Sequence, residues 1–119
     1  MCRYISSIIR DSAGRLLMEY LQDGSWQALG GEVADGESPK EAFIRITGET
    51  AGLMFDDIEM SRVIKRVDGR EIHVFSATLD ENDEELIKDD KSFGLFKEDE
   101  INGMKLKPET KFVLKRIFD

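Results

Sequence analysis

The sequence has 119 residues, of which 40% are hydrophobic and 35% charged, and its 17 basic and 25 acidic side chains give a net charge of −8. This size and composition predict a single folded domain, 1–119, rather than a disordered chain. A surface so acidic disfavours long nucleic acids, because binding them relies on basic side chains that displace counterions. The apolar runs are too short to cross a bilayer, and the first residues lack the pattern of a secretory signal, so we expect a cytoplasmic protein without membrane contact.

The chain begins with two strand-like segments. Residues 4–9 and 16–21 are rich in β-branched and apolar side chains, and the turn-forming residues 11–14 separate them. A short segment follows at residues 26–29, after a second turn signal. The one cysteine, Cys2, forms neither an internal disulfide nor a metal cluster. These features predict the first strands of a sheet.

A hairpin is predicted farther along the chain. Residues 61–67 and 71–79 are strand-like, and between them Asp68-Gly69 tolerates the positive φ that a tight turn requires. His73, the single histidine, lies in the middle of the second strand, with no cysteine or histidine beside it. We therefore expect His73 to pack within the sheet rather than to bind a metal.

The clearest helix signal is a capping box. Ser38 is the predicted N-cap, Pro39 occupies the first helical position, and Glu41 follows three residues after the cap. The helix is predicted to run to about Ala51 and to end at Gly52, a common residue just past a helix C-terminus.

A second helix is predicted from Pro108, with one apolar stripe made of Phe112, Val113, Ile117 and Phe118. Between the two helices, the acidic residues 80–91 are predicted to be a solvated loop, with or without one helical turn. Strands that alternate with two helices indicate an α/β (α+β) fold in which helices cover a mixed β-sheet.

The double glycine Gly30-Gly31 and the helix after it form a candidate phosphate site. Glycines let backbone amides approach a ligand closely. On the predicted helix, Glu41, Arg45 and Glu49 are spaced i, i+4 and i+8 and lie along one side, so Arg45 can bridge either acid. Taken without this spacing, Glu49 would be an ordinary surface ion-pair residue.

The same segment resembles the Nudix box, in which Gly, five residues, Glu and seven residues precede Arg-Glu-apolar-x-Glu-Glu-x-Gly-apolar. Counting from Gly31, the matching positions are Glu37, Arg45, Glu49, Gly52 and Leu53. The elements before and after the box also agree, so the resemblance covers essentially the whole chain. It implies an α/β/α sandwich that hydrolyses a phosphoanhydride of a nucleoside diphosphate derivative or nucleoside triphosphate with Mg²⁺ or Mn²⁺.

The resemblance also assigns roles to residues. Glu49 and Glu37 are the implied metal ligands, with Glu49 also catalytic, and Arg45 organises the loop. Gly30 and Gly31 are expected to contact a small nucleotide-type substrate. Family members often form homodimers, so a homodimer is one possible oligomeric state of this chain.

Two further roles come from outside the box. Glu98, with its neighbours Asp99 and Glu100, is a candidate general base, because some family members take an acid from a later loop; a solvated helix start is the plainer interpretation. Trp26 is a candidate for stacking on a base, as are Phe75 and Phe96, although aromatic residues in such strands usually belong to the core.

Three box positions depart from the family pattern. Ile46 and Thr50 stand where the family has glutamates, and Thr47 replaces an apolar residue. Phe43, Thr47 and Thr50 share the side of the helix predicted to face the core, with Ile46 at its edge. Two functions therefore remain open: a divergent hydrolase with a weakened metal site, which the retained frame favours, and an inactive Nudix-fold module that binds a nucleotide or a protein. A fold unrelated to nucleotides is a third, weaker alternative.

Overall fold

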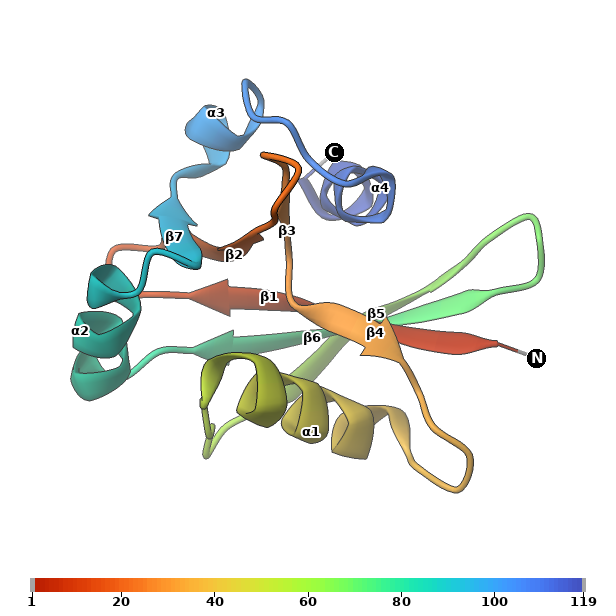
Figure 1. The fold of residues 1–119 in the computed structure, drawn as a ribbon. Helices are drawn as coiled ribbons and strands as arrows, with labels where there is room; N and C mark the ends of the chain where they lie inside the picture. Colours follow the sequence, from red (N-terminus) through yellow and green to blue (C-terminus); the bar gives the residue numbers. More distant parts are fainter. Residues whose placement is uncertain (1, 119) are drawn as a thin grey trace.

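The computed structural model describes residues 2–118 (Figure 1). Its strands are β1 (Arg3–Arg10), β2 (Leu16–Tyr20), β3 (Trp26–Gln27), β4 (Gly30–Glu32), β5 (Glu59–Lys65), β6 (Glu71–Thr78) and β7 (Phe93–Phe96). Its helices are α1 (Pro39–Ala51), α2 (Glu81–Asp89), α3 (Glu98–Ile101) and α4 (Pro108–Phe118).

The strands form one mixed sheet, as the sequence predicts. Its main path is β3-β2-β1-β6-β5, with β4 pairing with β1 and β7 with β2. Strands β1 and β6 are parallel, and the other pairs are antiparallel. Helix α1 lies on one side of the sheet, and α3 and α4 lie on the other (Figure 1). The α/β prediction is confirmed.

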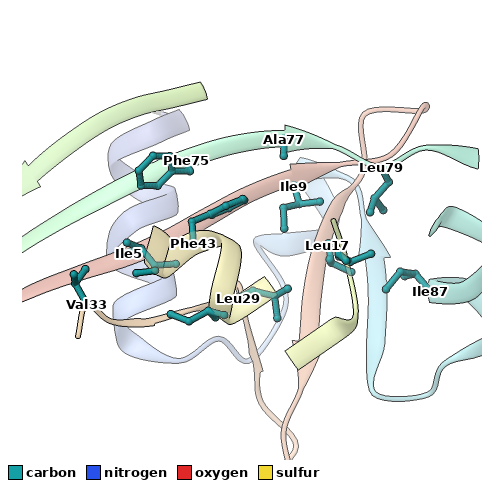
Figure 2. Close-up of a cluster of buried hydrophobic side chains, with 13 residues drawn as sticks. Ile5, Ile9, Leu17, Leu29, Val33, Phe43, Phe75, Ala77, Leu79 and Ile87 are labelled. Atoms are coloured by element: carbon teal, nitrogen blue, oxygen red, sulfur yellow. The ribbon is translucent and has the colours of Figure 1, made fainter. Parts of the chain in front are cut away.

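Two hydrophobic layers hold the helices to the sheet. On the α1 side, Phe43 packs among residues of β1 and β6, including Ile5 and Phe75 (Figure 2). On the α4 side, Val113 is buried with other side chains, including Ile72 of β6. Alternate residues of β6 thus enter opposite layers, which is the period-two pattern of a strand covered on both faces.

Helix α1 begins and ends where the sequence predicts. The Ser38 hydroxyl accepts the Glu41 amide N–H at 3.1 Å, and the Glu41 carboxylate accepts the Ser38 amide N–H at 2.9 Å. After Ala51 the chain enters the left-handed region at Gly52, where φ is 67°. This reciprocal cap fixes the start of the helix directly after the loop that carries the box residues.

The predicted loop at residues 80–91 is wrong, because most of it forms α2. Asp80 caps this helix, and Ile87, which is 3% exposed, enters the α1-side core. The buried Glu84 accepts the Ser12 amide N–H at 2.5 Å, so an acidic side chain also anchors the helix. The β7 strand that follows is a further element that the sequence pattern did not predict.

Two side-chain placements also differ from expectation. Thr50 is exposed rather than facing the core, because Leu53, which follows the turn at Gly52, fills the core beside the end of α1. In α4, Leu114 is buried together with Val113, so the buried stripe is centred differently from the predicted one. Within residues 2–118 we find no helix of the length and apolar character that a membrane crossing requires.

Candidate functional site

Arg45 and Glu37 join α1 to the loop that precedes it. Arg45 Nε lies 2.8 Å from Glu37 Oε2, and Arg45 Nη2 lies 3.1 Å from Glu37 Oε1. The same guanidinium donates to the Glu32 carbonyl at 3.1 Å, and the Ala34 amide donates to Glu37 Oε1 at 3.0 Å. Hydrogen bonds from Arg45 and Ala34 hold the pKa of Glu37 below its usual value. Both carboxylate oxygens of Glu37 are therefore engaged in holding the loop.

Glu49 lies at the edge of the same cluster. Its Oε2 is 3.8 Å from Arg45 Nη1, and its side chain is 70% exposed. The structure thus brings Glu37, Arg45 and Glu49 together, as their spacing predicts, and leaves Glu49 as the carboxylate that is least committed to other contacts. Its role as a ligand or catalytic residue stays a prediction.

Ile46 fills the space between α1 and the double glycine. The side chain is 8% exposed and belongs to the α1-side core. A Cβ placed on Gly31 would lie 3.1 Å from Ile46 Cδ1, so Ile46 packs directly against this glycine. A Cβ on Gly30 would lie only 2.5 Å from the Ile5 carbonyl oxygen, so β4 approaches β1 too closely for any side chain at that position.

A hollow opens beside the double glycine, toward α4. It has a volume of about 120 Å³ and lies between β1, Gly30-Gly31 and the first turn of α4, which contributes Glu109. Glu109 Oε1 is buried and has no hydrogen-bond partner within residues 2–118. Sequence reasoning missed Glu109; the only signal was its place near the start of a predicted helix, which is weak on its own.

The basic and amide groups at this hollow are already engaged with the protein. Lys107 Nζ lies 2.7 Å from Asp23 Oδ2, and Gln27 Nε2 donates to Glu19 Oε1 at 2.9 Å. A buried carboxylate oxygen without a partner requires explanation, because such groups are almost always satisfied by the protein, a water or a ligand. The hollow therefore presents an acceptor that fits a donor from a bound molecule.

Glu98 and Trp26 lie apart from the box cluster. Glu98 lines a hollow between α3 and α4, on the opposite side of the sheet from α1 (Figure 1). Trp26 packs between Tyr20 and Phe96, with ring centroids 4.7 and 4.8 Å away. The structure therefore does not bring Glu98 to Glu49, and it places Trp26 in an aromatic cluster.

His73 lies in the sheet, as predicted. Its side chain is 13% exposed, and its Nε2 is 3.5 Å from Glu71 Oε1. Neither ring nitrogen has a hydrogen-bond partner within residues 2–118.

No protein-family model matches the sequence, and no curated protein resembles it in sequence. Solved structures do match. The protein DR0079 from Deinococcus radiodurans superposes with a TM-score of 0.80 at 17% identity, over 99% of this chain and 83% of that one. A mutT/nudix family protein from Listeria innocua gives 0.74 at 20% identity, over 98% and 91%. The NUDIX domain of Shewanella oneidensis NrtR, complexed with ADP ribose, gives 0.71 at 11% identity, over 97% and 84%.

The chain has the Nudix fold. Residues 31–53, which resemble the Nudix box, span the end of β4, the loop after it, α1 and the turn at Gly52. In this chain the two replaced positions have different surroundings. Ile46 is in the core and Thr50 is on the surface.

The described residues do not form the carboxylate cluster that the Nudix resemblance implies. Within residues 2–118, no group of three or more His, Cys, Asp or Glu side chains could hold a metal ion. Glu37 is bound through both oxygens, and the Ile46 side chain cannot coordinate a metal. On α1, Glu49 is exposed and its carboxylate has only the 3.8 Å contact with Arg45. A cluster of several divalent ions does not fit this donor set.

Proposed function

We propose that this chain binds a nucleotide-type ligand at its Nudix box and does not hydrolyse it through a metal cluster on α1. The observation that carries this proposal is the position of Ile46, which packs in the core against Gly31. An apolar side chain stands where the family has a carboxylate, and it neither binds a cation nor accepts a proton. The ion pair between Arg45 and Glu37 keeps the shape of the box without a metal.

The ligand class rests on the fold and on the hollow beside the double glycine. Solved structures with this fold include a NUDIX domain complexed with ADP ribose. At about 120 Å³ the hollow is smaller than a pocket for a whole drug-sized ligand, so it suits one part of a ligand. Glu109 Oε1 is a buried acceptor without a partner within residues 2–118, and the amino group of adenine, cytosine or guanine would supply the matching donor.

A second candidate is the divergent hydrolase, which the exposure of Glu49 favours. Its carboxylate is 70% exposed beside Arg45 and Glu37. Mg²⁺ commonly binds through one or two carboxylates together with the phosphates of the substrate. Glu49 would then be the one protein ligand of an ion delivered with the nucleotide. In such a hydrolase, no carboxylate at position 46 would activate the attacking water.

Calorimetry with and without Mg²⁺ separates the two functions. We expect ADP to bind in the presence of EDTA, and we expect ADP, CDP and GDP to bind more tightly than UDP, whose base lacks an amino group. Glu109→Gln should reduce that difference, because an amide in place of the carboxylate removes the negative acceptor. Absence of binding to every nucleotide in the panel would overturn the proposed function.

Turnover is measured in parallel. The protein is incubated with Mg²⁺ or Mn²⁺ and with nucleoside triphosphates, dinucleotides or ADP-sugars, and phosphate release is followed. We expect none above background. Release that is abolished by Glu49→Gln but retained by Glu85→Gln, an exposed acid on α2, would establish the hydrolase instead.

A further inference from the structure

Basic side chains gather at one end of this acidic molecule. Residues 62–70 carry four basic residues and one acidic residue, and residues 104–118 carry five basic residues and one acidic residue. Residues 80–100 have the opposite balance, with three basic and ten acidic side chains. The β5–β6 turn and α2 lie at opposite ends of the sheet (Figure 1). The positive charge is thus concentrated near the turn of the hairpin and α4.

The hairpin and α4 are held against each other at this end. Arg62 Nη1 donates to the Arg116 carbonyl at 2.6 Å. The Cζ atoms of Arg66 and Arg116 lie 4.9 and 5.0 Å from the centre of the Phe112 ring. Cation–π contacts therefore place two guanidinium groups on one aromatic ring. Two guanidinium groups on one ring concentrate positive charge there, and this charge attracts an anion.

Arg66, Phe112 and Arg116 border an open hollow of about 350 Å³, here called the Phe112 pocket, which is lined by Lys65, Arg66, Val67, Asp68, Phe112 and Arg116. The volume falls at the small end of the range for sites that hold small molecules. Val67 is fully exposed beside it, so the pocket also has an uncovered apolar wall.

The one acid in the Phe112 pocket is held by a residue outside it. Asp68 Oδ2 lies 2.8 Å from Arg70 Nε, and Asp68 Oδ1 accepts the Arg70 amide N–H at 3.1 Å. Within residues 2–118, no carboxylate forms an ion pair with Lys65, Arg66 or Arg116. Within residues 2–118, the pocket therefore carries three cationic groups that form no ion pair.

We propose that the Phe112 pocket binds a small phosphate-bearing molecule, at a site separate from the Nudix box. Guanidinium groups form paired hydrogen bonds with phosphate oxygens, and a third cation suits a group of more than one negative charge. Phe112 and Val67 offer contact area to an apolar or planar part of the ligand. The local cations also overcome the repulsion that a net charge of −8 exerts on an approaching anion.

The test uses phenyl phosphate, inorganic phosphate and benzyl alcohol as probes, with binding followed by amide chemical shifts and calorimetry. Phenyl phosphate should bind and move the amide signals of residues 65–68 and 112–116. Inorganic phosphate should move the same signals at higher concentration, which separates a free ion from a phosphate carried on a planar body. Benzyl alcohol, which lacks the charge, should move none of them.

Variants locate the binding site. Arg66→Gln with Arg116→Gln should weaken phenyl phosphate at least about tenfold, since two charge-assisted hydrogen-bonding groups are lost. The matched control, Lys88→Gln with Lys91→Gln, removes the same charge at the α2 end and should leave the affinity unchanged. Thermal unfolding checks that both variants fold. Equal loss in the two variants, shifts confined to other residues, or no binding at millimolar phenyl phosphate would overturn the proposal.

Discussion

Replacing Ile46 with glutamate tests whether a core side chain has taken the place of a metal ligand. Ile46 is 8% exposed, and full burial of an isoleucine contributes about 1.5–3 kcal/mol to the free energy of unfolding. A carboxylate there also loses hydration without gaining a hydrogen-bond partner, which costs at least about 1 kcal/mol more. Without metal, Ile46→Glu should therefore lower the free energy of unfolding by about 2.5–4 kcal/mol.

Urea denaturation in EDTA measures that loss, and Ile44→Glu is the matched control. Ile44 lies two residues earlier on α1 and is 51% exposed, so the same substitution should cost no more than about 0.5 kcal/mol there. In a protein of this size, the loss from Ile46→Glu should lower Tm by roughly 12 °C. If the two variants lose equal stability, Ile46 is not the packing residue described above.

Adding Mg²⁺ completes the test of position 46. With Thr50→Glu also present, both family glutamates are restored, and Thr50 is exposed, so its change should cost little by itself. Mg²⁺ binds only the folded form of a restored site and should raise its stability by about 2.7 kcal/mol at a hundred times the Kd. Mg²⁺ should leave the parent protein unchanged. Equal responses of the double variant and the parent to Mg²⁺ would show that the metal position has been misplaced.

Three further outcomes are expected from denaturation measurements. The pKa of Glu37 lies below its usual 4.5, so its ion pair with Arg45 stabilises the fold above that pH. This stabilisation is lost as pH falls through the lowered pKa. The difference in unfolding free energy between the parent and Glu37→Gln should therefore be constant near neutral pH and shrink below about pH 4.5. Gly30→Ala should cost about 1–3 kcal/mol because its Cβ would lie only 2.5 Å from a backbone oxygen, whereas Gly48→Ala on α1, whose Cβ would meet the Leu53 carbonyl oxygen at an ordinary 3.9 Å, should stabilise by about 0.5–1 kcal/mol. Ile87→Ala should cost about 2–4 kcal/mol if α2 is anchored as described.

Local signals in the sequence predicted much of the fold. The cap of α1 depends on Ser38, Pro39 and Glu41, which act within one turn, so the local sequence is enough to predict it. The turn at Asp68-Gly69 was predicted from local sequence in the same way. In the structure Gly69 has φ of 90°, and the strands on either side pair as predicted. Fixed spacing on one helix likewise placed Glu49 beside Arg45.

Other features depend on contacts between distant segments. Helix α2 was missed because its composition is that of a solvated acidic loop, whereas its stability depends on Ile87 in the core and on the Glu84 bond to the Ser12 amide. Thr50 was misplaced because periodicity does not show that Leu53 turns back into the core. The buried oxygen of Glu109 becomes evident only when α4 is packed against β1 and β4.

The replacement of two glutamates is compatible with a well-formed box because loop shape and metal binding depend on different residues. Arg45 links Glu37 and the Glu32 carbonyl, so it fixes the loop to α1 with bonds that need no ion. A carboxylate at position 46 would have to lie between α1 and Gly31, where a metal would be needed to compensate for its burial. Ile46 removes that requirement and adds apolar packing at the same place. A chain selected for binding alone would gain stability from this exchange, whereas a metal-dependent hydrolase would have to rely on Glu49 as its protein ligand.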